Sequence, residues 1–347
     1  MIAAVRLRPY TLPLRRPWVA ASATITVRRG MLVRLEAIDG TVGWGDCAPL
    51  PSSGDTGHRR VFEALSTVAG RLPGQPVDEI PAGLAPPEVG WAVETAIMDL
   101  RARRRGVGLA RLLAEAAVPA VAVNAALGPL DAGCVGRATA ALARGFDLGK
   151  IKVGLAPVAE ELQALRRLNR HLGGRMRLRL DANRAWENDD ARSFLAGLAG
   201  LPVDGIEEPL ADPTLDSLAR LQDTVAFAVA IDESLARLGL DAVIDAGAVR
   251  RLVVKPARLG GLGRTLDLAA RARDAGLELV LTSVVDSAIG LTAAAQLAAA
   301  LPLPAAHGLA TSDWLAEDVC LPPVVASGWL RLPDGPGLGR SPLDQPA

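Results

Sequence analysis

The chain has 347 residues and a mass of 36.0 kDa, half of its residues are hydrophobic, and 38 basic residues balance 38 acidic ones. A formal net charge of zero provides no basic field for nucleic acid or for an anionic membrane, which argues against both classes of partner. The length suits one large barrel or two domains with a sizeable core.

The cysteines and the hydrophobic segments predict a soluble, cytoplasmic protein. Cys47, Cys134 and Cys320 lie far apart and form no CxxC motif, so we expect neither a disulfide framework nor a zinc site. No apolar run approaches the roughly 18 to 20 residues of a membrane span. Residues 1–18 mix apolar positions with arginine, which indicates a first strand rather than a signal peptide.

Residues 1–118 are predicted to form an α+β domain. The segments "MLVRLEA" and "GTVGWGDCAPL" alternate apolar and polar positions and contain glycine and proline, which is typical of an antiparallel meander. The segment "PPEVGWAVETAIMDLRARRRG" then repeats apolar residues at helical spacing and ends at a glycine, so we expect a long helix there.

Residues 119–310 contain eight short apolar runs at intervals of roughly 23 to 29 residues, separated by alanine- and leucine-rich helical segments. This repeated strand and helix unit favours a closed parallel β/α barrel over the alternative, a doubly wound open sheet. Residues 311–347 are predicted to return to the first domain as strand and turn. The eight runs are "AVNAAL", "KIKVG", "LRLDAN", "GIEEPL", "FAVAIDES", "RLVVKPAR", "LVLTSVVDS" and "PAAHGLA".

Acidic residues recur at the ends of three consecutive runs. Asp181, Glu207 and Asp232 each stand where a barrel strand finishes, which is where active-site residues of barrels lie. Carboxylates without histidine or cysteine nearby select a hard cation, so the pattern predicts a Mg²⁺ site, with Mn²⁺ as the other choice. The alternative is that these acids cap helices or pair with arginines.

Lysine is rare in this chain, and its positions are informative. Only Lys150, Lys152 and Lys255 occur among the 38 basic residues, and all three lie at strand ends. Period-two geometry places Lys150 and Lys152 on one face of their strand, toward the barrel mouth. Arginine stays protonated, whereas a crowded or desolvated lysine can lose its proton and act as a base. The alternative is that three lysines remain by chance at solvated positions.

The histidine at the end of the eighth run has two interpretations. His307 either faces the site or serves as a buried structural residue. The cluster "RLGGLGR" lacks the full dinucleotide-binding fingerprint, and we expect a tight turn between a strand and a helix.

The motifs "KIKVG", "LRLDANRAW", "IEEPL", "AIDESL", "VVKPARLGG" and "SVVDSAIG", in this order, resemble the muconate lactonizing enzyme subgroup of the enolase superfamily over essentially the whole chain. The resemblance implies an α+β capping domain over a modified TIM barrel, (β/α)7β. It also implies a divalent metal held by residues 181, 207 and 232, and an opposed pair of catalytic lysines, Lys152 and Lys255, with Lys150 lowering the proton affinity of Lys152. Supporting or substrate-binding roles are implied for Lys150, Asn183, Glu233, Ser283 and Asp286.

Within that subgroup, "GWGDCAPLPSSG", "KVGL", "LRLDANRAW" and "DESL" are most similar to the o-succinylbenzoate synthase family. This resemblance implies Mg²⁺-dependent dehydration of a small-molecule carboxylate in menaquinone biosynthesis, by a protein that can form homo-oligomers. Asp46 and Asp286 depart from the pattern, because the family often has glutamate at both positions.

Other activities of the subgroup stay open. Two opposed lysines are also suited to racemisation or epimerisation, since each can exchange an α-proton. Dipeptide epimerases of the subgroup carry a D-x-D motif near the last barrel strand, whereas this chain has Ser312-Asp313-Trp314 there. N-acylamino acid racemisation and cycloisomerisation remain alternatives, and a barrel that binds an acid or a metal without turnover is the non-enzymatic one.

Overall fold

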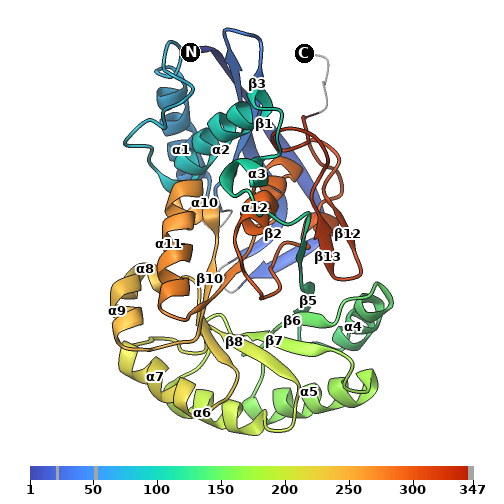
Figure 1. Cartoon of the computed structure of the whole chain (residues 1–347). Helices are drawn as coiled ribbons and strands as arrows, with labels where there is room; N and C mark the ends of the chain where they lie inside the picture. Colours follow the sequence, from blue (N-terminus) through green and yellow to red (C-terminus); the bar gives the residue numbers. More distant parts are fainter. Residues whose placement is uncertain (21–22, 51–53, 343–347) are drawn as a thin grey trace.

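The structure is a computed structural model of the chain, and it describes residues 1–20, 23–50 and 54–342 (Figure 1). Residues 51–53 of the "GWGDCAPLPSSG" motif and residues 343–347 of the predicted C-terminal segment lie outside the described residues.

The N-terminal part is an antiparallel sheet covered by helices, as predicted. β1 (Ile2–Ala20), β2 (Ala23–Ala37) and β3 (Val42–Cys47) pair in that order. α2 (Pro87–Arg104) packs on β3 across Gly43 and Gly45, where a Cβ atom would collide with carbonyl oxygens of the helix. These two glycines therefore allow the close approach of sheet and helix. The helices of this part are α1 (Gly54–Ala69), α2 (Pro87–Arg104) and α3 (Leu109–Leu113).

A seven-stranded parallel sheet forms the second part, and its strands neighbour one another in chain order. Nearly all residues of its strands are buried or half-buried, because the sheet curls on itself and helices cover its outside (Figure 1). The strands are β5 (Ala125–Pro129), β6 (Leu148–Lys152), β7 (Arg177–Asp181), β8 (Val203–Glu207), β9 (Ala228–Ile231), β10 (Arg251–Val254) and β11 (Glu278–Leu281).

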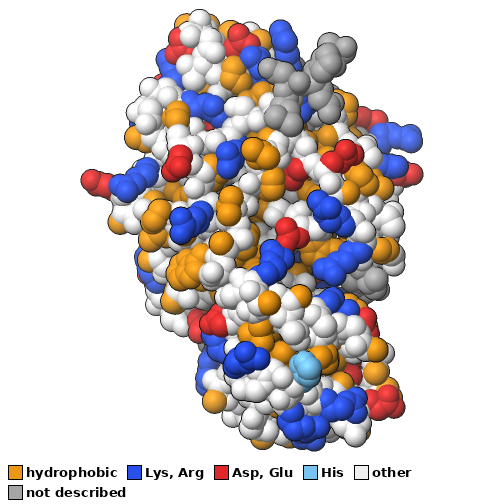
Figure 2. Space-filling model, turned by 90° about the vertical axis from the view of Figure 1, so that its right-hand side faces the viewer, with side chains coloured by type: hydrophobic (Ala, Val, Ile, Leu, Met, Phe, Trp, Pro, Cys, Tyr) orange, Lys and Arg blue, Asp and Glu red, His pale blue; other side chains and the backbone are white. Residues whose placement is uncertain are grey.

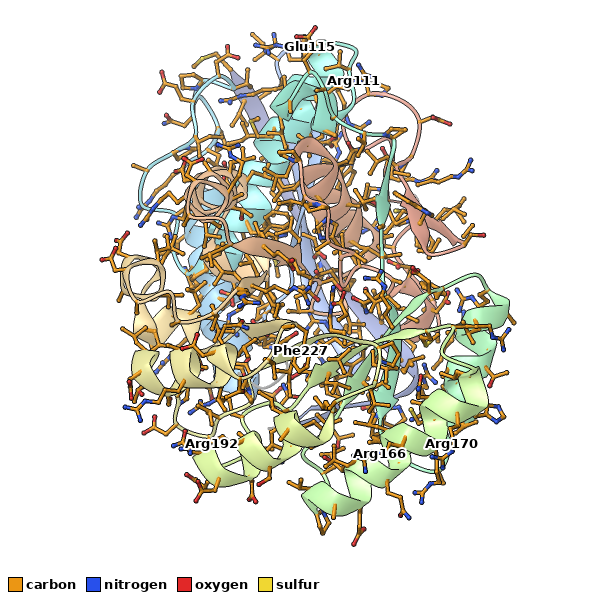
Figure 3. All side chains as sticks on the ribbon, turned by 60° about the horizontal axis from the view of Figure 1, so that its bottom comes forward. Arg111, Glu115, Arg166, Arg170, Arg192 and Phe227 are labelled. Atoms are coloured by element: carbon orange, nitrogen blue, oxygen red, sulfur yellow. The ribbon has the colours of Figure 1, made fainter. Side chains whose placement is uncertain are left out.

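The helices between these strands show why the exposed arginines are not candidates for the site. Arg166 and Arg170 on α5 (Val158–Leu172) and Arg192 on α6 (Asn188–Gly197) point away from the strands (Figure 3). The connecting helices are α4 (Cys134–Ala143), α5 (Val158–Leu172), α6 (Asn188–Gly197), α7 (Leu215–Asp223), α8 (Leu235–Leu238), α9 (Leu240–Asp245), α10 (Pro256–Leu259) and α11 (Leu262–Asp274). α10 and the two glycines after it replace the direct strand-to-helix turn expected from "RLGGLGR".

The eighth run does not form a strand of its own. His307 bridges to Val123 and Gly308 bridges to Thr282, both in parallel orientation, so the run links the two edges of the seven-stranded sheet. Prolines 302 and 304 precede this segment and cannot donate ladder hydrogen bonds, which shortens the pairing. The barrel class predicted from the sequence is confirmed, with a minimal eighth element.

The C-terminal segment contacts both parts. The hairpin β12 (Val324–Ala326) and β13 (Trp329–Arg331) pairs with β4 (Ala120–Ala122). The Leu338 amide donates to Asp99 of α2 at 2.6 Å. α12 (Ala288–Ala300) and a short 3₁₀ turn, η2 (Ser312–Trp314), precede the hairpin. The boundaries after residues 118 and 310 stay predictions. Across the described ranges, no helix combines the length and apolar character that crossing a membrane requires.

Candidate active site

A cavity of about 630 Å³ opens at the carboxyl ends of the parallel strands. The ends of β1 and β2 contribute Pro17, Trp18 and Ile25 to its wall, so the first domain covers the barrel mouth. The structure brings all the predicted site residues to this cavity except Asp286. Those that line it are Lys150, Lys152, Asp181, Asn183, Glu207, Asp232, Glu233, Lys255 and Ser283.

Lys150 and Lys152 share one face of β6 and meet the acids of the next two strands. The Lys150 Nζ lies 2.7 Å from Glu207 Oε2 and 2.9 Å from Asp181 Oδ2. The Lys152 Nζ donates to the same Asp181 oxygen at 2.8 Å. Strand register explains the meeting, because Lys152 pairs with Asp181 and Asp181 with Glu207 across neighbouring strands.

The charges on this face support one another. Burial opposes the charge of Lys150, but the carboxylates of Asp181 and Glu207 outweigh it and raise the Lys150 pKa above its usual value. Burial likewise opposes the charge of Asp181, and the two lysines overcome it, so the Asp181 pKa lies below its usual value. Lys150 is therefore a fixed positive charge beside Lys152.

Lys255 reaches the same cavity from the end of β10, three strands away from β7. Its ammonium group donates to Asp232 Oδ2. Burial is the largest cause that lowers the Lys255 pKa, to about 8, and the nearby positive charges of Lys150 and Lys152 act in the same direction. An arginine at this position would stay protonated.

Two residues with unusual backbone angles position these side chains. Asn183 and Glu208 both have φ 46°, a left-handed conformation that turns the chain sharply after β7 and β8. The Asn183 side-chain oxygen accepts from the Lys152 ammonium group, and the Asn183 backbone N–H donates to Asp181 Oδ1 at 3.0 Å. The Glu208 carboxylate accepts from the Asp232 and Ser234 amides, each at 2.8 Å.

The sequence analysis assigned no role to Glu208. In the sequence Glu208 is recognisable as the second glutamate of "IEEP". Its carboxylate also accepts from the Ser234 hydroxyl of the "IDES" run and so holds the loop after β9 in place. Other lining residues were also missed, namely Trp18, Arg258 and Thr311. Thr311 lies 2.7 Å from Ser283, oxygen to oxygen, and so supports that predicted residue.

Glu233 lines the cavity with its carboxyl group among other acids. Burial raises the Glu233 pKa, and repulsion from Asp181 and Glu207 adds to the increase, while Lys152 acts against it. The group can therefore hold a proton more readily than an exposed glutamate.

Asp286 lies behind the cavity wall, in the contact between the two parts of the chain. Its carboxylate is 3.9 Å from the Arg28 guanidinium, and burial raises the Asp286 pKa to about 6. Asp46 lies nearby and accepts from Tyr10 at 2.8 Å and from Ser287 at 2.7 Å. The two acids that are shorter than the family pattern thus belong to one buried network between cap and barrel.

His307 occupies a structural position. It is 1% exposed, its Nδ1 accepts from the Leu281 amide at 3.2 Å, and it does not line the cavity. Burial lowers the His307 pKa to about 4, and the charge of Arg179 acts in the same direction.

Asp181, Glu207 and Asp232 are the predicted ligands of a divalent metal. Among the described residues, no three acidic, histidine or cysteine side chains are gathered closely enough to bind a metal as they stand. Asp181 and Glu207 instead share the Lys150 ammonium group, and Asp232 contacts Lys255. Each carboxylate thus already has a cation as its partner. By charge and ligand type the set fits a hard divalent cation.

Comparison with known proteins places the chain in a family. A family model described as "Enolase C-terminal domain-like" matches residues 134–345. The chain belongs to this family. An o-succinylbenzoate synthase of Thermobifida fusca is 32% identical to it, over 92% of this chain and 84% of the relative. The L-Ala-D/L-Glu epimerase of Bacillus subtilis is 26% identical, over 94% of this chain and 93% of the relative.

A solved structure agrees with the family assignment. Muconate lactonizing enzyme from Pseudomonas fluorescens, complexed with muconolactone, matches this chain with a TM-score of 0.87 and 26% identity, over 98% of this chain and 96% of that one. The predicted membership of the enolase superfamily, and with it an enzyme on a barrel scaffold, is confirmed. These three relatives carry out different reactions, so family membership alone does not specify the substrate.

Proposed function

We propose that this member of the enolase family is an o-succinylbenzoate synthase, which removes water from 2-succinyl-6-hydroxy-2,4-cyclohexadiene-1-carboxylate. One observation carries the proposal: Lys152 and Lys255 line one cavity from β6 and from the end of β10, with the acids of the intervening strands between them. The Thermobifida fusca relative supports dehydration as the reaction.

The cavity wall suits a carboxylate that carries a ring. Beside the lysines, much of its lining is apolar, which is suited to burying ring carbons while the charged groups bind carboxylate oxygens. The apolar lining residues include Trp18, Ile25, Leu50, Leu235, Val253, Val254, Val284 and Trp314.

In the proposed reaction the Lys152 Nζ acts as the general base and takes the proton from the carbon that bears the ring carboxylate. The electrons of that C–H bond move into the carboxylate and form an enediolate. They then return to form the ring double bond as the C–O bond to the 6-hydroxyl breaks. The departing hydroxyl takes the proton back from Lys152 and leaves as water, so one lysine serves one face of the ring.

Lys255, and a divalent cation that the acids would hold, would stabilise the negative charge that develops on the carboxylate. The Lys255 ammonium group reaches the cavity from the other side and adds positive charge there. Asp181, Glu207 and Asp232 would hold a divalent cation, with Mg²⁺ first and Mn²⁺ second. When bound, this cation supplies Lewis-acid stabilisation of the carboxylate oxygens.

A second candidate, N-acylamino acid racemisation, is favoured by the same pair of lysines, since each can reach one face of an α-carbon. Dipeptide epimerisation has less support. Asp313 lies in the segment where dipeptide epimerases carry the D-x-D motif. It does not line the cavity and instead pairs with Arg144 at 2.6 Å. No acid of the described residues between 307 and 318 faces the cavity to bind a substrate ammonium group.

The test is turnover of 2-succinyl-6-hydroxy-2,4-cyclohexadiene-1-carboxylate with Mg²⁺, followed by the loss of diene absorbance, with EDTA as the metal control. Lys152→Ala and Lys152→Arg should each lower kcat by at least about 100-fold, because neither side chain can exchange the proton at pH 7. Wild-type protein that exchanges the α-proton of an N-acylamino acid in D₂O without dehydrating the diene would overturn the synthase proposal in favour of the racemase.

A further inference from the structure

A second cavity lies beside the active site and is lined by three arginines. It measures about 230 Å³, and Arg16 from β1, Arg137 from α4 and Arg144 just after α4 contribute to its wall together with Asp313. We call this cavity the arginine pocket. The remainder of its wall is mostly apolar and includes Leu127, Ala140, Ala141, Phe146, Trp314 and Val325.

The charges of the arginine pocket are not balanced by its own residues. Among the described lining residues, three guanidinium groups face one carboxylate, that of Asp313, while Asp131 outside the wall pairs with Arg137. Asp313 pairs with Arg144, and both side chains are more than half exposed, so this ion pair is weak and exchangeable. Burial lowers the Arg16 pKa, and the positive charge of Arg137 acts in the same direction.

The N–H groups of the Arg16 guanidinium can donate hydrogen bonds to a ligand. Within the described ranges no hydrogen bond or ion pair joins its guanidinium to another residue, and its Cζ lies 4.0 Å above the Trp314 ring. Arg137 is held rigidly, because it donates to the Pro129 carbonyl at 2.5 Å and to Asp131 at 2.7 Å. The Arg16 guanidinium, stacked on the Trp314 ring, therefore keeps its donors for a planar anion, and Arg144 can join it by exchanging the exposed Asp313 carboxylate.

The arginine pocket shares a wall with the active site. Ala126, Ala310 and Trp314 line both cavities. Trp314 also packs edge-on against Trp18, with ring centroids 4.6 Å apart, and Trp18 covers the active-site cavity. In the view from the side of α4 and of the β12–β13 hairpin, basic side chains lie among hydrophobic ones across the middle of the face (Figure 2).

We propose that the arginine pocket binds a small organic carboxylate with an apolar body, and that this ligand ties β1 to α4 and so holds Trp18 over the active site. The carboxylate neutralises Arg16 and Arg144 from two different parts of the chain. Its apolar body lies against Phe146, Leu127 and the alanines of α4. This site is separate from the dehydration chemistry and does not depend on it.

The test titrates benzoate into the Lys152→Ala protein in the presence of EDTA, followed by tryptophan fluorescence, so that the active site contributes least. Benzoate should change the emission of the Trp314 and Trp18 pair and slow amide hydrogen exchange in β1. Benzamide, the neutral analogue, should bind at least about tenfold more weakly, since it lacks charge-assisted hydrogen bonds. Inorganic phosphate should also be at least about tenfold weaker, since it has no apolar body.

Variants in the same background locate the response. Arg16→Gln and Arg144→Gln should each weaken benzoate binding by about tenfold or more. Arg170→Gln, an exposed arginine on α5, is the matched control and should leave it unchanged. Asp313→Asn frees Arg144 and should tighten binding several-fold, a gain that loss of folding could not produce. Equal binding of benzamide or phosphate, or a response that survives both arginine variants, would overturn the proposal.

Discussion

We expect Arg28 to contribute strongly to the stability of the contact between the capping domain and the barrel. Replacing Arg28 tests the buried network that contains Asp46 and Asp286. Its side chain is fully buried on β2 and donates to three carbonyl oxygens, those of Val285 at 3.1 Å, Pro49 at 2.7 Å and Ala48 at 3.0 Å. It is also the positive charge beside Asp286.

Arg28→Met keeps much of the side-chain volume but removes every donor. Three buried carbonyls then lose their partners and Asp286 loses its counter-charge, and breaking a buried pair of this kind costs about 3 to 5 kcal/mol. The neighbouring Arg29 is the matched control. It pairs with Asp55 at 3.3 Å with both side chains more than half exposed, so Arg29→Met should cost about 0 to 1 kcal/mol.

Urea unfolding of the two variants, followed by circular dichroism at pH 8 and pH 5, provides the measurement. The Asp286 pKa of about 6 already exceeds its usual 3.8, and loss of the Arg28 charge raises it further. Between 3.8 and that raised value the folded state binds the extra proton, so stability falls as pH rises. Arg28→Met should therefore cost more at pH 8 than at pH 5. A loss below about 1 kcal/mol at both pH values, equal to that of Arg29→Met, would refute the reasoning.

Three further predictions follow from the site and its support. Lys255→Arg keeps the charge near Asp232 but not the compact ammonium group, and kcat for the diene substrate should fall at least about 100-fold. Asn183→Ala removes one partner of Lys152, so kcat should fall about tenfold while circular dichroism stays unchanged. The His307 pKa of about 4 lies below the unfolded 6.5, so stability is fully present above pH 6.5 and declines by about 3 kcal/mol toward pH 4. His307→Asn should flatten that decline in urea midpoints measured from pH 7 to pH 4.

The strand-end positions could be predicted because parallel strands impose a strict geometry. A residue that ends a buried strand must lie at the carboxyl edge of the sheet, and the two-residue period places Lys150 and Lys152 on one face. The meeting of Asp181 with both lysines follows from register alone, since β6 and β7 pair residue by residue. Seven of the eight predicted runs therefore became strands at or near their expected positions.

The remainder could not be predicted, because it depends on contacts between segments far apart in the chain. Asp286 looked like a site residue in "SVVDSAIG", yet Arg28, 258 positions earlier, lies against it behind the cavity wall. The eighth run shares the apolar texture of the others, but closing the barrel needs only two bridges at His307 and Gly308. The pattern of apolar residues in a segment indicates that it is buried. Contacts with distant segments determine which of its side chains reach the cavity.

Arginine and lysine occupy different kinds of position in this chain. Arginine serves where a permanent charge is needed, as on the outer helices at Arg166 and Arg192 or in the buried clamp at Arg28 (Figure 3). Lysine occurs only in the cavity, where Lys150 is held charged by two carboxylates and burial brings the Lys255 pKa to about 8. The same side chain can thus be a fixed cation or a group that exchanges its proton, according to the carboxylates around it. A chain that uses arginine at its other basic positions retains lysine where that choice has chemical consequences.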